Sequence, residues 1–177
     1  MSSIQDDLFS GNQGTEHNGR SLTLIDGHAL AFRSYYAIRQ MNNSRGRSVN
    51  AVWGFTRSLM RLLKEDNDGD VTIVAFDAPA KTFRHEQYED YKAGRADTPE
   101  DLPDQIDTIR RVVELMGVYQ IEVPGLEADD IIGTLAVRSA AAGYEVEIVT
   151  SDRDAYQLVS DRITVRGLDR TERFGPA

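Results

Sequence analysis

Short apolar runs recur along the chain, and amphipathic segments lie between them. The runs are 22–26 (LTLID), 71–77 (VTIVAFD), 119–125 (YQIEVPG), 145–152 (EVEIVTSD) and the weaker 163–167 (ITVRG). The segments 49–64, 106–116 and 128–142 repeat apolar residues with a period near 3.6, which is typical of helices. Strands that alternate with helices predict an α/β fold with a mostly parallel central sheet flanked by helices. Uninterrupted apolar runs such as VTIVAF further suit a sheet that is buried on both faces.

The overall composition fits one globular domain. The 177 residues suffice for a hydrophobic core, and no apolar run reaches the roughly 18 residues that a membrane span needs. The chain has no cysteine, which excludes disulfides and thiolate zinc sites. Residues 1–20 are polar and lack the apolar core of a signal peptide, so we interpret them as a flexible tail and expect 21–177 to form the domain. We therefore expect a cytoplasmic protein with no membrane partner.

Acidic residues follow four of the apolar runs. They are Asp26, Asp77, Glu127, Asp129, Asp130, Asp152 and Asp154. The carboxyl ends of parallel strands meet at one edge of a sheet, where ligands of such folds bind, so we expect these side chains to gather there. Helix capping explains any one cluster equally well. Together, however, unpaired carboxylates would repel one another unless protons or cations neutralised them.

Divalent cations are the simplest means of neutralising such a cluster. Carboxylate oxygens suit Mg²⁺ or Mn²⁺, and the lack of Cys and of a His-x-x-x-His pair points away from zinc. Two such ions about 4 Å apart hold and activate a scissile phosphate in many enzymes. The net charge of −9 argues against a generally basic nucleic-acid coat, but it is compatible with a metal-dependent nuclease.

Two basic stretches are candidates for phosphate contact. Segment 76–103 places Lys81, Arg84, His85, Lys92 and Arg95 among aromatic and acidic residues. It is either a solvated helix face or a segment that arches over the acidic edge and contacts a nucleic-acid backbone. The loop 42–48 carries Arg45 and Arg47 around a glycine and is a second, weaker candidate.

Four stretches, in this order, resemble a known family. They are LIDGHALAFRSYYAI, FDAPAKTFRHEQYEDYKAGRADTPEDLPDQ, VPGLEADDIIGTLA and VTSDRDAYQLVSDRI. They resemble the 5′-nuclease domain of bacterial DNA polymerase I, within the flap endonuclease family, from about Leu22 to the chain end. The resemblance implies a PIN-like, resolvase-like nuclease fold with a helical arch. It also implies metal-dependent hydrolysis of DNA near 5′ ends or flaps, in replication and repair.

The resemblance also implies roles for individual residues. Asp26, Asp77, Glu127 and Asp129 look like the surroundings of a first Mg²⁺ or Mn²⁺ ion, and Asp152 and Asp154, with Asp130 nearby, like those of a second. Arg84 and Lys92 look like phosphate-facing residues of the arch. Together with the four acids around the first ion, they form the implied set of catalytic residues. Lys81, His85, Arg95, Arg45 and Arg47 are further expected DNA contacts. The implied setting is a monomer that carries polymerase domains in the same chain and acts on nucleoid DNA.

One departure leaves alternatives open. In the family, a helix–turn–helix DNA-binding segment and two further aspartates follow the last matching stretch, whereas this sequence stops at FGPA (174–177). We therefore interpret the chain as a C-terminally truncated domain with reduced activity. The alternatives are a DNA-binding module inactivated by truncation and a PIN-like nuclease that acts on RNA. A phosphotransfer enzyme with an aspartyl-phosphate is disfavoured, since Asp26-Gly-His does not supply the usual Asp-x-Asp pair.

Overall fold

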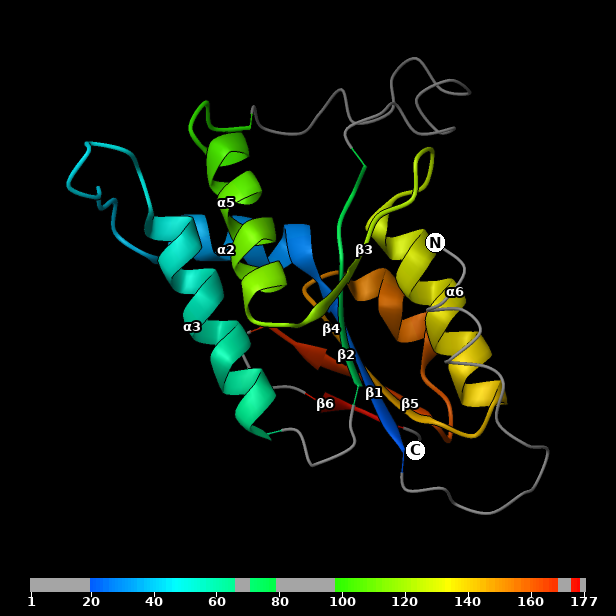
Figure 1. Cartoon of the computed structure of the whole chain (residues 1–177). Helices are drawn as coiled ribbons and strands as arrows, with labels where there is room; N and C mark the ends of the chain where they lie inside the picture. Colours follow the sequence, from blue (N-terminus) through cyan, green and yellow to red (C-terminus); the bar gives the residue numbers. More distant parts are fainter. Residues whose placement is uncertain (1–19, 66–70, 79–97, 169–172, 176–177) are drawn as a thin grey trace.

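A six-stranded sheet forms the centre of the molecule, with helices on both faces (Figure 1). The computed structural model describes residues 20–65, 71–78, 98–168 and 173–175. Its strands are β1 Ser21–Asp26, β2 Val71–Ala75, β3 Tyr119–Ile121, β4 Glu145–Thr150, β5 Ile163–Gly167 and β6 Arg173–Phe174. Its helices are α2 Gly27–Ala37, α3 Asn50–Glu65, α5 Leu102–Leu115, α6 Ala128–Ala141 and the 3₁₀ helix η1 Arg153–Leu158. The predicted α/β class with a mostly parallel sheet is confirmed.

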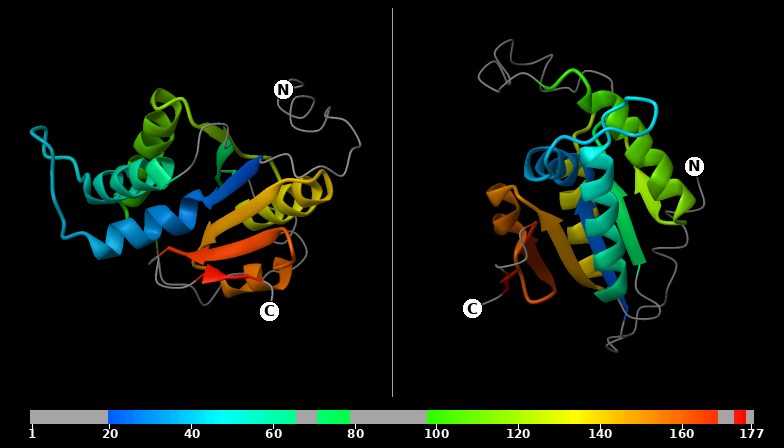
Figure 2. Two further views of the ribbon diagram at one scale, coloured as in Figure 1. Left: turned by 90° about the horizontal axis from the view of Figure 1, so that it is seen from below. Right: turned by 90° about the vertical axis from the view of Figure 1, so that its left-hand side faces the viewer.

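The strand order explains why the helices occupy both faces. The order is β3-β2-β1-β4-β5-β6, with the first five strands parallel and β6 antiparallel to β5. The chain moves outward from β1 to β3, then returns to β4 on the other side of β1. Because crossovers between parallel strands are right-handed, reversing direction moves the connecting helix to the opposite face. Accordingly, α2, α3 and α5 lie on one face and α6 and η1 on the other (Figure 2).

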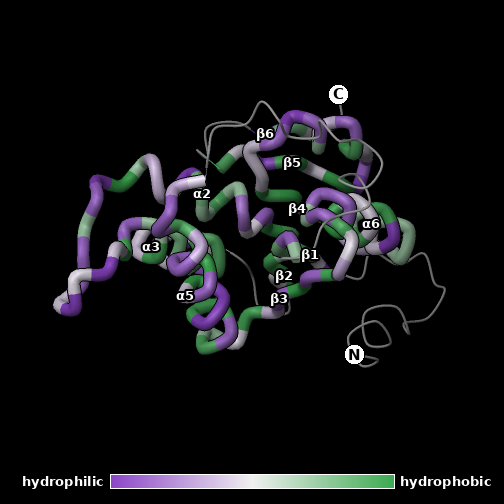
Figure 3. The backbone as a smooth tube through the Cα atoms, turned by 90° about the horizontal axis from the view of Figure 1, so that it is seen from above, coloured by the Kyte–Doolittle hydropathy of each residue, from purple (hydrophilic) through white to green (hydrophobic). Residues whose placement is uncertain are grey.

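Two hydrophobic cores sandwich the sheet. Ile25, Val74 and Val149 point toward α2, α3 and α5. Their neighbours Leu24, Ile73 and Ile148 point toward α6. Since successive residues of a strand face opposite sides, a strand that is buried on both faces must be apolar throughout. Helices α3 and α5, by contrast, alternate between hydrophilic and hydrophobic residues (Figure 3).

Some element boundaries differ from the sequence predictions. Strand β3 ends at Ile121 rather than at residue 125, because Pro124 and Gly125, with φ 85°, belong to a turn before α6. Helix α5 begins at Leu102, with a proline in its first turn, four residues before the apolar repeat. Helix α2 was not predicted, because glycine, alanine and serine make up most of its buried stripe and give little amphipathic contrast.

Two predicted features lie outside the described residues. The expected tail falls almost wholly within 1–19. Most of the expected arch segment 76–103 falls within 79–97, which includes Lys81, Arg84, His85, Lys92 and Arg95. In the described part of the chain, no helix combines the length and apolar character that crossing a bilayer requires.

Candidate functional site

Asp26 is a buried acid at the carboxyl edge of the sheet. It ends β1, caps α2 and is only 6% exposed. Its Oδ1 accepts a hydrogen bond from the backbone N–H of Ala29 at 2.8 Å, and its Oδ2 accepts one from Thr150 Oγ1 at 3.0 Å. Burial raises the pKa of Asp26, while these two donors act in the opposite direction. The orientation of this carboxyl group is therefore set by β1, α2 and β4 together.

The turn after Asp26 depends on a glycine. A Cβ atom at Gly27 would lie 2.6 Å from the Phe76 ring and 2.8 Å from the Ala75 carbonyl oxygen. Both distances are shorter than real Cβ contacts allow, so no other residue fits without displacing β2. Gly27 thus lets Asp26 stand directly beside the end of the neighbouring strand.

Asp77 joins the end of β2 to the start of α6. Its Oδ1 accepts a hydrogen bond of 2.7 Å from the backbone N–H of Ala128, the first residue of α6. Its own N–H donates to His28 Nδ1 at 3.1 Å, which requires an unprotonated Nδ1. Its carbonyl accepts a 2.9 Å hydrogen bond from Arg110 Nη2, and the Arg110 guanidinium also lies 4.6 Å from the Phe76 ring centroid. Asp77 is therefore fixed through both its backbone and its side chain.

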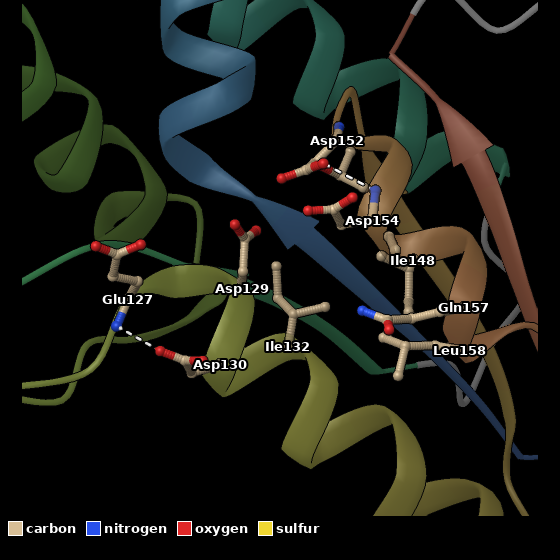
Figure 4. Close-up of a pocket in the computed structure, with 11 residues that line it drawn as sticks. Glu127, Asp129, Asp130, Ile132, Ile148, Asp152, Asp154, Gln157 and Leu158 are labelled. Atoms are coloured by element: carbon tan, nitrogen blue, oxygen red, sulfur yellow. Dashed lines mark hydrogen bonds between the residues drawn. The ribbon is translucent and has the colours of Figure 1, made fainter. Parts of the chain in front are cut away.

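The acids at the start of α6 divide into two groups. Glu127 is the N-cap, and it forms a capping box with Asp130, whose Oδ2 accepts from the Glu127 N–H at 3.3 Å. Asp129 lies between them in sequence, but its carboxylate is directed toward Asp152 and Asp154 (Figure 4). Capping therefore accounts for Glu127 and Asp130 but gives no reason for Asp129.

The acids after β4 lie across the same hollow. Asp152 caps η1, with its Oδ1 accepting from the Asp154 N–H at 2.9 Å. The Asp152 N–H in turn donates to Thr150 Oγ1 at 3.1 Å. Capping thus explains part of this cluster too, while Asp154 itself is exposed at the rim of the hollow.

Electrostatics link acids from four segments. Partial desolvation, followed by the charges of Asp26, Asp152, Asp77 and Glu127, raises the pKa of Asp129 to about 7. The four charged neighbours come from the ends of β1, β2 and β4 and the start of α6. Strand order accounts for the arrangement, because β1 and β4 are neighbours at the point where the connections reverse direction.

The acids of α6 and of the turn after β4 border a cavity of about 360 Å³, whose lining does not include Asp26 or Asp77. Its lining is Glu127, Asp129, Asp130, Ile132, Ile148, Thr150, Asp152, Asp154, Ala155, Gln157 and Leu158. Among the described residues, no group of three or more His, Cys, Asp or Glu side chains is already gathered closely enough to hold a metal ion. The donor chemistry nevertheless fits a hard divalent cation, since carboxylate oxygens predominate and their mutual repulsion is relieved by positive charge.

Arg45 and Arg47 lie elsewhere. They belong to a loop closed by a bridge between Asn42 and Ser48, which extends away from the sheet (Figures 1 and 3). Asn43 Oδ1 accepts from the Arg45 N–H at 2.9 Å and from the Arg47 N–H at 3.1 Å. The loop is therefore ordered by its own hydrogen bonds, and both arginine side chains are exposed. The structure does not bring them to the acidic edge.

Three residues that contact the acids were not singled out from the sequence. Thr150 bonds Asp26 and the Asp152 backbone, and His28 and Arg110 both bond the Asp77 backbone. The position of Thr150, last in a strand and directly before Ser-Asp, was a usable signal. Nothing in the sequence indicates Arg110, because its contact spans 33 residues.

Comparisons with known proteins identify the family and the fold of the chain. Residues 21–177 match the family model of the 5′-3′ exonuclease N-terminal, resolvase-like domain. The thermostable DNA polymerase I of Thermus thermophilus is 55% identical over 150 residues, which are 85% of this chain and 18% of that protein. The DNA polymerase I of Deinococcus radiodurans is 54% identical over 157 residues, which are 89% of this chain and 16% of that protein. The chain thus spans less than a fifth of the length of these relatives.

Solved structures share the fold at low sequence identity. A T5 protein co-crystallised with metal ions matches with a TM-score of 0.65 at 23% identity, over 88% of this chain and 58% of that one. The catalytic core of Rad2 in complex with DNA substrate matches with a TM-score of 0.50 at 18% identity, over 82% of this chain and 44% of that one. With an acid edge at the reversal point of a parallel sheet and a family match that extends from β1 to the last residue, the chain belongs to the 5′-3′ exonuclease N-terminal, resolvase-like domain family.

Proposed function

We propose that this chain is a divalent-metal-dependent nuclease domain that hydrolyses DNA phosphodiester bonds near 5′ ends and flaps. The observation that carries the proposal is the Asp129 carboxylate, which faces other acids instead of capping its helix. A site that holds several carboxylates together at an electrostatic cost is suited to a cation and, through it, to an anionic substrate. The 5′-3′ exonuclease family supports the choice of a nuclease.

The acids divide between two cation positions in this proposal. Asp26, Asp77, Glu127 and Asp129 hold one Mg²⁺ or Mn²⁺ ion, and Asp152 and Asp154, with Asp130 nearby, hold another. Bound divalent cations supply water activation and neutralisation of phosphate charge. The protein's own contribution is orientation. Hydrogen bonds from Ala29 and Thr150 orient the carboxyl group of Asp26. Hydrogen bonds from Ala128 and Arg110 hold the side chain and the backbone of Asp77, so that both acids lie at the same edge of the sheet.

DNA contact is assigned to two stretches. Lys81, Arg84, His85, Lys92 and Arg95 are assigned from the sequence alone, with Arg84 and Lys92 facing the reacting phosphate. Arg45 and Arg47 are assigned as a separate backbone contact on an ordered, exposed loop. The relatives are DNA polymerases several times longer than this chain, which supports a domain joined to polymerase domains in the same protein. That this domain works as a monomer and acts on nucleoid DNA is part of the proposal.

The direct test is cleavage of a labelled 5′-flap DNA by this chain with Mg²⁺. Asp26→Asn and Asp129→Asn should each lower turnover by about 100-fold or more, because each removes a charge that the cations require. Asp107→Asn, an exposed acid in the middle of α5, is the matched control and should cleave normally.

Three outcomes would redirect the proposal. Wild-type turnover in both edge variants would exclude the acids from catalysis. Cleavage of an RNA flap in preference to DNA would make the chain an RNA nuclease. Flap binding in Ca²⁺ without any product in Mg²⁺ or Mn²⁺ would make it a DNA-binding module.

A further inference from the structure

Thr150 stands between the two groups of acids. It is the last residue of β4 and is 3% exposed. The β1–β4 register pairs Ile25 with Val149, which places Thr150 beside Asp26. Its neighbour on β5 is Gly167, so no side chain on that strand stands opposite its own. A polar group this deeply buried is expected to be hydrogen-bonded.

The direction of each hydrogen bond at Thr150 is settled by chemistry. The Asp152 backbone N–H can only donate, so Thr150 Oγ1 accepts at that contact, which is 3.1 Å long. The hydroxyl proton is then available to Asp26 Oδ2 at 3.0 Å. One hydroxyl therefore accepts from the β4 acid turn and donates to the β1 acid.

These contacts connect Asp26 and Asp152, whose relative positions are not fixed by the hydrogen bonds of the sheet alone. Asp26 belongs to β1, whereas Asp152 begins a 3₁₀ turn beyond the last ladder position of β4. Asp152 in turn helps to fix Asp154, because Asp152 Oδ1 accepts a 2.9 Å hydrogen bond from the Asp154 N–H. Thr150 is thus the link through which the placement of Asp152 and Asp154 follows that of Asp26.

We propose that Thr150 is a positioning residue of the acidic edge. Its hydroxyl sets the spacing between the acid of β1 and the acid turn after β4, and so sets how the two groups share divalent cations. This inference rests on the proposed function, because it assumes that the edge holds cations. Groups that orient metal ligands without touching the metal commonly contribute about 10–100-fold to metal affinity.

The test compares three single variants by titration with Mn²⁺ alone, followed by electron paramagnetic resonance. Thr150→Val keeps the shape but removes the hydroxyl, and should weaken Mn²⁺ binding by about 10–100-fold. Thr150→Ser keeps the hydroxyl and should restore binding. Thr164→Val removes a β5 hydroxyl whose contact is the Val146 carbonyl at 3.4 Å, and should bind as the wild type does.

The readouts separate positioning from general stability. All variants are melted in EDTA, where Thr150→Val and Thr164→Val are both expected to unfold at somewhat lower temperature. Only Thr150→Val should lose Mn²⁺ affinity and, in parallel, require more Mg²⁺ for flap cleavage. If Thr150→Val does not fold, Thr150→Cys, which has a weak donor, takes its place with the same expectation.

Three results would overturn the inference, and they are distinguishable. Equal Mn²⁺ affinity in the wild type and Thr150→Val would remove the positioning role while leaving the cation site intact. A wild-type chain that binds no Mn²⁺ would defeat the proposed function and this inference with it. A Thr150→Ser variant as weak as Thr150→Val would also contradict a role for the hydroxyl.

Discussion

Two regions of this molecule treat charge in opposite ways. Residues 27–64, which span α2, its following loop and nearly all of α3, contain seven Arg and Lys and no Asp or Glu. All seven are exposed: Arg33, Arg39, Arg45, Arg47, Arg57, Arg61 and Lys64. The remaining residues carry the other 13 Arg and Lys and all 29 Asp and Glu, and the acids at the sheet edge include the buried Asp26 and Glu127.

The two regions differ in how much free energy their charges cost on folding. Exposed cations keep their hydration, so a cationic surface is almost neutral for folding. Carboxylates drawn together and partly desolvated lower stability unless something compensates them. At the acidic edge the compensation is incomplete, because backbone N–H groups serve Asp26, Asp77 and Asp152 while Asp129 faces like charge. The acidic edge therefore has the energetics of a functional site, whereas the exposed charges of the cationic segment cost the fold little.

The largest effects are expected when two acids of the same edge are removed separately. Asp77→Ala and Asp129→Ala should each lower flap cleavage by about 100-fold or more. Their effects on the metal-free protein should differ in sign. Asp77→Ala deprives the Ala128 N–H of its acceptor and should destabilise the fold by about 1 kcal/mol. Asp129→Ala removes repulsion and should raise the melting temperature in EDTA.

Calorimetry in EDTA, beside flap-cleavage rates, measures both effects. For a chain of this size, about 1 kcal/mol corresponds to roughly 2–4 °C in melting temperature. A lower melting temperature for both variants would mean that Asp129 supports the fold, and the contrast within the edge would disappear.

The next prediction concerns the cationic segment. Arg47→Glu should weaken binding of flap DNA in Ca²⁺ by about 10-fold and lower the dependence of log affinity on log salt by about one unit. Arg138→Glu, on the outer part of α6 at the other sheet face, changes the net charge equally and is the control. Fluorescence anisotropy across a salt series measures both. Equal losses in the two variants would indicate that net charge, rather than the loop, governs affinity.

The fold and the gathering of acids at one sheet edge were predictable from the sequence, for a physical reason. Buried parallel strands must be apolar throughout, so the runs ending at Asp26 and Asp77 stood out, and topology places their ends at one edge. What each carboxylate does there was not predictable. Glu127 caps helix α6 and Asp129 does not. This difference is decided by which backbone N–H groups lie within reach of each carboxylate after folding. Helix α2 escaped prediction because small side chains can bury a face without an apolar pattern.

The pH dependence of stability is a third, smaller predicted effect. The pKa of Asp129 is raised to about 7 in the folded chain, against an ordinary value of 3.8. Between these values the folded state binds more protons than the unfolded state, so stability in EDTA should fall as pH rises from about 4 to 7. Asp129→Asn should flatten that part of the profile. Melting curves at pH 5 and pH 8 for both proteins test this. An equal pH dependence in the variant would assign the effect to other groups, such as Asp26.

The smallest expected effect comes from the loop that presents Arg45 and Arg47. Asn43 Oδ1 accepts from both of their backbone N–H groups, and Gly46 adopts φ 75° to close the turn. Because these groups are exposed, Asn43→Ala should change the free energy of unfolding by no more than about 0.5 kcal/mol. It should nevertheless lower DNA affinity by roughly threefold, since both arginines must then be ordered on binding. Asn42→Ala, whose side chain makes only a long contact with Ser48 at 3.5 Å, is the control. A loss for Asn43→Ala as large as that for Arg47→Glu would mean that loop order, more than arginine charge, makes this surface a nucleic-acid contact.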